Sequence, residues 1–422
     1  MTGSPVWHPF TQHALQPAAI EIARGEGAWL ETREGTRLLD MISSWWVVTH
    51  GHRHPRIVRA IKDQADRLDQ VIFAGFTHAP AEELARRLVA RLGPALAHVF
   101  YSDSGSTSVE VALKMALGFW KNRGERRTRI VALEHAYHGD TIGTMSTGAR
   151  GVFNSAYEPM LFDVVRVPFP HEGREDATLD ALKAACADGS AAALLVEPLL
   201  LGAGGMLTYA PRVLREMREI CAASGTLFIA DEVMTGFGRT GTFLACDQAG
   251  VTPDILCLAK GITGGSLPLA VTLCSAEIFD AHYSTDRSKT FFHSSSYTAN
   301  PIACAAAVAN LDIWDEEPVA ARIAEIAREH ALFLEGLRMD ARFSGIRQCG
   351  TIAALDLCVA DEGYLAGVGP ALYEFFLSRG LLLRPLGNTI YLMPPFCVTK
   401  DELGRAYEAI MDAAATFGRG AR

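Results

Sequence analysis

A carboxylate and an amine end two short apolar runs of this chain. Asp231 closes the run 226–231 (TLFIAD), and Lys260 closes the run 254–260 (DILCLAK). Apolar runs of this length, bounded by glycine, proline or polar residues, are typical of fully buried strands. Because ligands bind at the carboxyl ends of strands in an open parallel sheet, we expect both side chains to face one ligand site.

A lysine and an aspartate at such an edge suit a cofactor with both an aldehyde and a pyridine nitrogen. Pyridoxal phosphate (PLP) is such a cofactor. Lys260 would form a Schiff base with the aldehyde, and Asp231 would keep the ring nitrogen protonated so that the ring accepts electrons. The alternative is a simple ion pair at the edge of the sheet, and these two residues alone do not choose between the two interpretations.

A segment of small polar residues, 102–106 (SDSGS), stands between a predicted strand and a predicted helix. Gly105 and Ser106 would open that helix, where free backbone N–H groups and the helix dipole favour an anion such as a phosphate. The simpler interpretation is an ordinary helix cap, for which Ser and Asp are preferred. Beside Asp231 and Lys260, the phosphate site is the better interpretation.

Further residues could face the same site. Tyr137 follows the predicted strand 129–133, so its ring could stack on a flat cofactor. Arg384 follows an apolar run, and a guanidinium there suits a carboxylate, although a surface arginine is the alternative. Trp45 and Trp46 are adjacent and point in different directions, so one could lie in the core while the other lines an apolar pocket.

Two motifs that suggest other functions are weak in their context. Residues 236–241 (GFGRTG) match the pattern of nicotinamide- and flavin-dinucleotide-binding proteins. No periodic helix follows Gly241, so we expect a loop that shapes the wall of the site instead. His50, His52 and His54 have no acidic or cysteine neighbour in the sequence, and we interpret them as surface or helix-capping residues rather than metal ligands.

The composition is that of an ordinary globular protein. The 422 residues are 49% hydrophobic and 21% charged, which allows two or three domains with a large core. A net charge of −9 argues against nucleic acid or an anionic membrane as the partner. No apolar stretch approaches the roughly 20 residues that cross a bilayer, and the first residues do not resemble a signal peptide. The nine cysteines include no Cys-x-x-Cys pair, so we expect reduced thiols, no metal and a cytoplasmic protein.

Strands and helices alternate from about residue 80 to residue 310. Predicted helices cover 81–92, 106–122 and 211–223, and predicted strands cover 98–101, 129–133, 192–196, 227–230, 255–258 and 269–274. This alternation predicts an α/β fold with a mostly parallel sheet, followed by a smaller α+β domain. The predicted division is an N-terminal segment (1–46) that packs with the small domain, a large cofactor-binding domain (47–314) and a C-terminal small domain (315–422).

The order of these motifs resembles that of the class III aminotransferases of PLP fold type I. Asp231, then 236–241, then 260–265 (KGITGG) carry the resemblance, which runs nearly from end to end. The chain is most similar to the branch that converts 8-amino-7-oxononanoate to 7,8-diaminononanoate in biotin synthesis. The selective segments are 7–11 (WHPFT), 43–46 (SSWW), 137–140 (YHGD), 202–206 (GAGGM) and 391–395 (YLMPP).

The resemblance implies a role for each matched position. The residues implied to bind the cofactor are Lys260, Asp231, Tyr137, Gly105, Ser106, Ser295 and Ser296, with Lys260, Asp231 and Tyr137 also acting in catalysis. The residues implied to bind the substrates, a keto acid and an amino donor, are Phe10, Trp45, Trp46, Ser294 and Arg384. Such enzymes are homodimers that share the active site across the interface, with residues 293–300 reaching the cofactor of the neighbouring subunit.

Two positions depart from the family pattern. Phe10 stands where relatives have tyrosine, and Ser294 stands where they have glycine. Both lie in the region that would hold the amino donor. Most relatives use S-adenosylmethionine and some use lysine, and segment 289–293 (KTFFH) is more like the lysine-using branch, so the donor stays open. The alternative functions are an ω-amino acid or amine:pyruvate transaminase of the same class, and a PLP decarboxylase or epimerase on the same fold.

Overall fold

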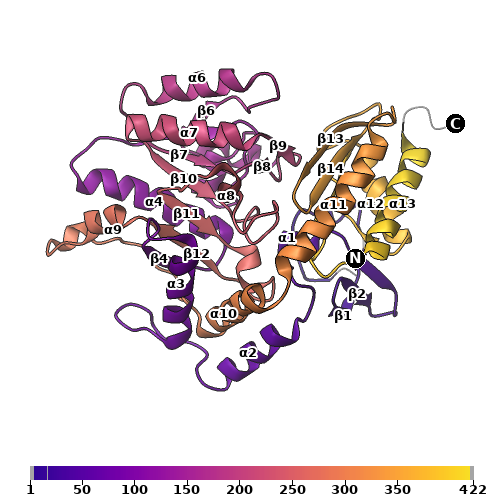
Figure 1. The fold of residues 1–422 in the computed structure, drawn as a ribbon, viewed down its shortest axis with the longest axis horizontal. Coiled ribbons are helices and arrows are strands. Elements are labelled where there is room, and N and C mark those ends of the chain that lie inside the picture. The colour runs from indigo at the N-terminus through magenta and orange to yellow at the C-terminus, as the bar shows by residue number, and fades with distance from the viewer. Residues whose placement is uncertain (1–3, 17, 419–422) are drawn as a thin grey trace.

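The computed structural model describes residues 4–16 and 18–418. The chain forms a large lobe, in which helices surround a sheet, and a smaller lobe built from N-terminal and C-terminal elements (Figure 1). The predicted boundaries at 46/47 and 314/315 stay a prediction. Residues 1–3 and 17 of the N-terminal segment, and 419–422 of the small domain, lie outside the described residues.

The sheet of the large lobe has seven strands. They are β4 (His98–Ser102), β5 (Arg129–Leu133), β6 (Val165–Val167), β7 (Ala191–Val196), β10 (Leu227–Asp231), β11 (Ile255–Leu258) and β12 (Ala270–Cys274). Their order is β4-β12-β11-β10-β7-β5-β6. β12 pairs antiparallel with both of its neighbours, and the remaining pairs are parallel. The predicted α/β fold with a mostly parallel sheet is confirmed.

Helices cover both faces of this sheet (Figure 1). The helices of the large lobe are α2 (Pro55–Ala65), α3 (Ala79–Leu92), α4 (Gly105–Asn122), α5 (Ile142–Thr147), α6 (Glu175–Cys186), α7 (Pro211–Ser224), α8 (Ala245–Ala249), α9 (Ala276–His282) and α10 (Pro301–Glu316). Apolar residues of α4 and α9 pack on one face, and those of α3, α6, α7, α8 and α10 pack on the other. Because both faces are covered, β7 is buried at every position, which explains its uninterrupted apolar run.

Local signals fix the ends of the helices that lead to the site. α4 begins with a capping box, in which the Thr107 N–H donates to Ser104 Oγ and the Ser104 N–H donates to Thr107 Oγ1. α7 begins at Pro211 and ends before Gly225, whose φ of +67° is left-handed. The predicted helices 106–122 and 211–223 therefore differ from α4 and α7 by one residue each.

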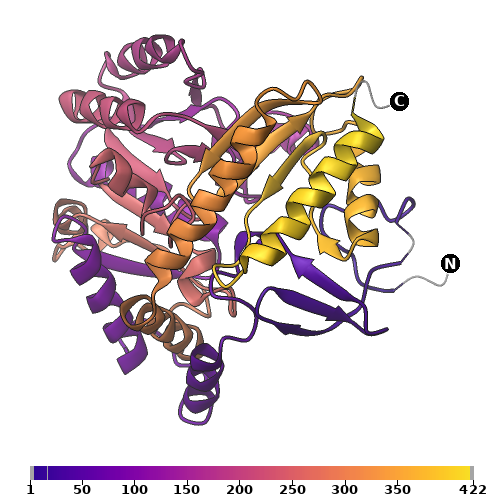
Figure 2. The ribbon, with the colours of Figure 1, turned by 45° about the vertical axis from the view of Figure 1, so that its right-hand side comes forward.

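The smaller lobe joins the two ends of the chain (Figure 2). Its elements are β1 (Ile22–Glu26), β2 (Trp29–Thr32), β3 (Arg37–Asp40), α11 (Val319–Leu337), β13 (Phe343–Cys349), β14 (Ile352–Leu357), α12 (Val368–Ser378), β15 (Leu381–Leu382), β16 (Thr389–Leu392) and α13 (Lys400–Phe417). One sheet has the order β1-β2-β3-β15 and the other has the order β13-β14-β16. Because β15 pairs with β3, the N-terminal strands share a sheet with the C-terminal part of the chain.

All nine cysteines lie in the described part of the chain and are unpaired; six are buried and three are partly buried. Among residues 4–16 and 18–418, no helix has the length and apolar character that crossing a membrane requires. The same residues contain no group of three or more His, Cys, Asp and Glu side chains placed to hold a metal ion.

Candidate active site

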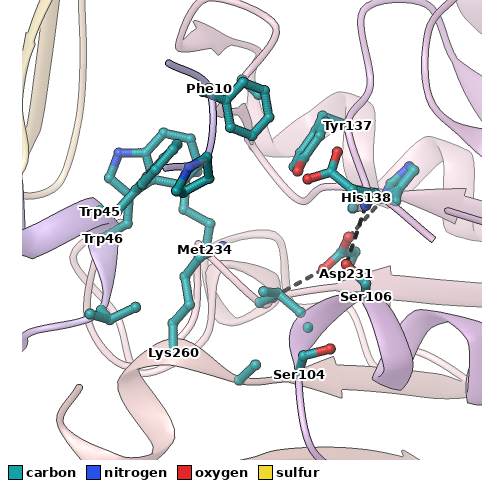
Figure 3. A pocket seen from close by; sticks show the side chains of 18 of the residues that line it. Phe10, Trp45, Trp46, Ser104, Ser106, Tyr137, His138, Asp231, Met234 and Lys260 are labelled. Atoms are coloured by element: carbon teal, nitrogen blue, oxygen red, sulfur yellow. Dashed lines mark hydrogen bonds and ion pairs between the residues drawn. The ribbon is translucent and has the colours of Figure 1, made fainter. Parts of the chain in front are cut away.

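A cavity of about 610 Å³ lies at the carboxyl ends of β10 and β11. Both lobes contribute to its walls: Asp231, Lys260 and Tyr137 come from the large lobe, and Arg384 and Tyr391 come from the smaller one. Figure 3 shows the side chain of Lys260 running toward Trp46, with Asp231 on the other side of the cavity. A cavity volume of about 610 Å³ is large enough to hold a cofactor and a substrate together.

The pairing of two strands brings Asp231 and Lys260 to this cavity. β10 and β11 are parallel neighbours in which Asp231 lies beside Cys257. Lys260 follows Cys257 by three residues, so it leaves the sheet at the same edge as Asp231. The Lys260 Nζ atom lies 5.2 Å from the centre of the Trp46 ring. The register of the two strands therefore brings Asp231 and Lys260 to the same cavity, as the sequence predicts.

Asp231 is held in place by a buried histidine. His138 Nδ1 lies 2.7 Å from Asp231 Oδ2, and the Val233 N–H donates to Asp231 Oδ1 at 3.1 Å. The His138 side chain is fully buried, so this pair is shielded from water. His138 was not among the predicted site residues, although it stands beside Tyr137 in the segment 137–140 that carries the family resemblance.

A second buried carboxylate, Glu197, also lines the cavity and was not predicted. It accepts hydrogen bonds from the Tyr137 N–H at 2.9 Å and from the Gly202 N–H at 3.0 Å. It thereby ties together two loops of the cavity wall. Glu197 follows β7 directly, and an acidic residue after an apolar strand is the same signal that marked Asp231.

Burial raises the pKa of Glu197 to about 7. Because the pKa of Glu197 is higher in the folded protein than in the unfolded chain, the folded protein keeps this proton to a higher pH. The contribution of Glu197 to stability is therefore lost as the pH rises from about 4.5 to about 7. Relative to Glu197→Gln, the cofactor-free wild type should lose up to about 1.4 kcal/mol of unfolding free energy per pH unit in that window. Urea unfolding of both proteins at pH 5, 6, 7 and 8 measures this difference. A difference that does not change with pH contradicts the prediction.

The N-terminus of α4 forms one end of the cavity. Asp103, Ser104, Gly105 and Ser106 line it, and the Asp140 N–H donates to Ser106 Oγ at 3.3 Å. The segments on either side pack closely, since a Cβ on Gly139 would overlap Ser106 and a Cβ on Gly105 would meet Val233. A helix of 18 residues whose first turn opens into a cavity is a suitable site for a phosphate.

The two tryptophans lie on an unusual left-handed turn. Residues Ser43–Trp46, marked α1 in Figure 1, have φ values of 52°, 45°, 69° and 74°. Each non-glycine residue in this conformation costs about 1–2 kcal/mol. Trp46 is buried, whereas Trp45 is 38% exposed, and both line the cavity. The sequence left open which of the two tryptophans lies in the core and which lines the pocket. The structure shows that Trp46 lies in the core and that its side chain also lines the cavity.

Buried hydrogen bonds hold this turn. Asp40 is fully buried and accepts hydrogen bonds from the Ser44 N–H at 2.9 Å and the Ser44 hydroxyl at 2.7 Å. His52 Nε2 lies 2.9 Å from the same carboxylate. Trp46 Nε1 donates to the Tyr391 hydroxyl at 3.0 Å. These contacts offset the strain of the turn, and the last of them fixes the Trp46 indole.

Arg384 lies at the mouth of the cavity. Its guanidinium is 5.2 Å from the centre of the Trp45 ring and donates to the Phe10 carbonyl oxygen at 3.0 Å. Within the described part of the chain, no carboxylate lies within ion-pair distance of Arg384. The aromatic rings of Phe153 and Tyr364, which the sequence did not mark, pack 4.5 Å apart beside it and line the cavity.

The structure does not bring Ser294, Ser295 and Ser296 into the cavity of their own chain. Ser294 and Ser296 are exposed, and the Ser295 N–H donates to Thr298 Oγ1 at 3.0 Å. Their predicted roles therefore depend on a second subunit.

The glycine-rich motif 236–241 lies behind the cavity rather than in its wall, which corrects our expectation. Arg239 within it is buried and donates to the carbonyl oxygens of Pro394, Trp46 and Val48 at 2.9, 3.3 and 2.9 Å. The motif thus ties the large lobe to the tryptophan turn and to the smaller lobe. Only the five-residue helix α8 follows it, so a dinucleotide-binding unit is excluded.

The interpretation of the three histidines as surface or capping residues was wrong for His50 and His52. His50 is buried, and that burial, followed by the influence of His54, lowers its pKa to about 3. His52 pairs with Asp40. His54 occupies the N-cap position of α2 without a capping hydrogen bond from its side chain, and its Nε2 atom lies 3.2 Å from Glu317 Oε1. Packing of the two lobes buries residues that look polar and exposed in the sequence.

The sequence profile of the family described as "Aminotransferase class-III" matches residues 10–414 of this chain. The chain belongs to the class III aminotransferases. An adenosylmethionine-8-amino-7-oxononanoate aminotransferase of Synechococcus elongatus is 47% identical over 96% of this chain and 97% of that protein. A protein of the same name from Geobacter sulfurreducens is 39% identical over 94% of this chain and 93% of that protein.

Solved structures of class III aminotransferases have the same fold. The adenosylmethionine-8-amino-7-oxononanoate aminotransferase of Methanocaldococcus jannaschii is 33% identical, with a TM-score of 0.93 over 98% of this chain and 97% of that one. A PLP-bound amine transaminase from an uncultivated Pseudomonas species is 34% identical, also with a TM-score of 0.93, over 98% and 99% of the two chains. As a class III member, this protein is a PLP-dependent aminotransferase.

The cavity of this aminotransferase fits PLP. The α4 N-terminus suits the phosphate, the Asp231–His138 pair suits a protonated ring nitrogen, and Tyr137 supplies a flat ring. Burial lowers the pKa of Lys260, although Asp231 and Glu197 oppose the effect. A lowered pKa leaves more of the amine unprotonated, which is the form that attacks an aldehyde.

Proposed function

We propose that this enzyme transfers an amino group to the 7-oxo group of 8-amino-7-oxononanoate and so makes 7,8-diaminononanoate for biotin synthesis. The observation that carries this proposal is the 47% identity over 96% of the chain to a relative named for that substrate. The test is direct: purified enzyme with PLP, 8-amino-7-oxononanoate and a donor should form the diamine. Absence of the diamine with every donor would refute the proposal.

The shape of the cavity supports this substrate. The molecule is an aliphatic chain with a carboxylate at one end, which requires an apolar channel that ends in a cation. Trp45, Phe153 and Tyr364 supply apolar walls, and Arg384 supplies the cation near the mouth. Lys260 and Asp231 lie deeper, so the carboxylate and the reacting carbon would occupy opposite ends.

The proposed chemistry divides between the cofactor and the protein. Bound PLP supplies an aldehyde that carries nitrogen between the two substrates and a ring that accepts electrons. Asp231 keeps the proton on the ring nitrogen. The Lys260 amine, whose pKa is lowered by burial, would move a proton to and from the substrate carbon, a role that typically contributes about 10²- to 10⁴-fold.

Replacing Arg384 with alanine should raise the KM for 8-amino-7-oxononanoate by about 10- to 150-fold. This range corresponds to the loss of a charge-assisted hydrogen bond, about 1.5–3 kcal/mol. Steady-state kinetics with the acid and with its methyl ester separate the charge from the rest of the substrate. The ester should react equally well with both enzymes, and Arg384→Lys should lose less than Arg384→Ala. An unchanged KM for the acid would exclude Arg384 as the carboxylate site.

We propose S-adenosylmethionine as the amino donor, with lysine as the alternative. The names of the relatives support the first donor. Phe10 and Ser294 are the two positions at which this chain departs from the family pattern. Phe10 lines the cavity beside Trp45, and the centres of the two rings lie 5.6 Å apart. Supplying each donor separately with the keto acceptor and measuring the diamine decides between them. Phe10→Tyr should then shift the preference toward S-adenosylmethionine if this position selects the donor.

An amine transaminase is the second candidate, because such an enzyme matches this chain at 34% identity and the same TM-score as the Methanocaldococcus protein. A panel of amino acceptors separates the two functions. Rates with pyruvate that exceed those with 8-amino-7-oxononanoate would favour the amine transaminase. Release of carbon dioxide from the donor, or its racemisation, would instead indicate a decarboxylase or an epimerase.

We further infer a cytoplasmic homodimer with active sites at the interface. Large apolar side chains near the serine segment 294–296 support this, since Phe292 and Tyr297 are 70% and 64% exposed and Phe76 is 61% exposed. Gln70 donates to the Ser296 carbonyl oxygen at 2.8 Å, which joins these two exposed segments. Sedimentation of the purified enzyme should give twice the mass of one chain. A monomer with full activity would refute the shared site.

A further inference from the structure

The turn that carries Lys260 has a backbone shape that lysine rarely adopts. Lys260 has a φ of +46° and opens a 3₁₀ turn, Lys260–Thr263. A non-glycine residue in the left-handed region is strained and persists only where its surroundings hold it there. The groups that hold this turn therefore decide where the Lys260 amine lies.

Asn310, in the middle of α10, binds this turn from outside. Its side chain is fully buried, and Nδ2 donates to the Gly261 and Ile262 carbonyl oxygens, both at 3.0 Å. Both partners are acceptors, so the amide must face the turn with its NH₂ group. In the described part of the chain, no other side chain donates to these two carbonyl groups.

The backbone of this turn packs closely against neighbouring segments on two sides. A Cβ on Gly261 would stand 2.8 Å from Phe237, so the chain passes directly against the loop of the motif 236–241. Gly264 ends the turn with a φ of +64°, and a Cβ there would meet Ile57 of α2. The turn is thus confined on both sides, and the two hydrogen bonds from Asn310 set its orientation.

We propose that Asn310 is a positioning residue for the Lys260 amine. By tying two carbonyl groups to the rigid helix α10, it holds Lys260 in the conformation from which the amine condenses with the cofactor aldehyde, with loss of one water. The inference rests on the proposed role of Lys260. Nothing in the sequence marks Asn310, which directly follows the alanine-rich stretch 303–309.

Two substitutions separate the hydrogen bonds from the space that Asn310 fills. Asn310→Leu has a similar shape but no donor, and Asn310→Ser keeps one donor. Cofactor-free enzyme is mixed with PLP, reduced with borohydride at increasing times, and analysed by mass spectrometry for the adduct at Lys260. Asn310→Leu should attach PLP about tenfold more slowly and lose kcat by a similar factor, with KM values within about twofold. Asn310→Ser should fall between it and the wild type.

Ile313→Ala is the matched control, since Ile313 is fully buried on the same helix and has no hydrogen bond to the turn. It should lower the melting temperature at least as much as Asn310→Leu while attaching PLP at the wild-type rate. Attachment by Asn310→Leu at the wild-type rate, or equal slowing by Ile313→Ala, would overturn the proposal. Wild type that forms its adduct at another lysine would instead refute the role of Lys260.

Discussion

Lys260→Ala should abolish the covalent adduct between this protein and PLP and lower kcat by at least about 10²- to 10⁴-fold, the contribution of a positioned base alone. Lys260 is the lysine that lines the cavity at the edge where Asp231 also ends its strand. Alanine can neither bond the aldehyde nor move a proton. Two measurements check this result: the visible absorbance of the enzyme with PLP, and the mass of the borohydride-reduced chain.

A surface lysine provides the control for this variant. Lys183 is exposed, pairs with Asp180 on α6 and does not line the cavity, so Lys183→Ala should keep wild-type absorbance and activity. Added methylamine should restore part of the activity of Lys260→Ala, because a free amine can replace the missing base. A Lys260→Ala enzyme that still forms the adduct and turns over normally would show that another residue carries the cofactor.

Asp231→Asn should lower kcat by about 10²- to 10³-fold, which corresponds to about 3–4 kcal/mol for the loss of one partner of a buried charge pair. The amide keeps the size of the carboxylate but not its charge, so it cannot keep the ring nitrogen protonated. His138, 2.7 Å away, would lose its charged partner as well. Steady-state kinetics and a PLP titration measure the effect, and the affinity for PLP should fall with kcat.

Asp254→Asn is the matched control for the loss of a carboxylate. Asp254 pairs with Arg218 at 2.9 Å near the start of β11, at the opposite end of the strand from the cavity. Its loss should reduce stability without changing kcat. If Asp231→Asn keeps kcat within threefold of the wild type, Asp231 is not the partner of the ring nitrogen.

The meeting of Asp231 and Lys260 at one cavity was predictable because its signals are local. Uninterrupted apolar runs mark strands that are covered on both faces, and the parallel arrangement follows from their alternation with helices. Asp231 and Lys260 stand at the ends of such runs, so their positions in the sequence place them at one edge of the sheet. Gly105 and Ser106 were predictable for the same reason, since a helix start after a strand points to that edge. The same reasoning, applied to β7, would have found Glu197.

Tertiary structure alone decided the rest. The turn Ser43–Trp46 contains no glycine that would predict positive φ values; it is held by Asp40 and by a hydrogen bond to Tyr391, which is 345 positions away in the chain. Asn310 acquires its partners only because α10 packs on the Lys260 turn. Local sequence determines which backbone conformations have a low free energy. Strained conformations and buried polar contacts exist only where distant segments supply the hydrogen bonds that offset their cost.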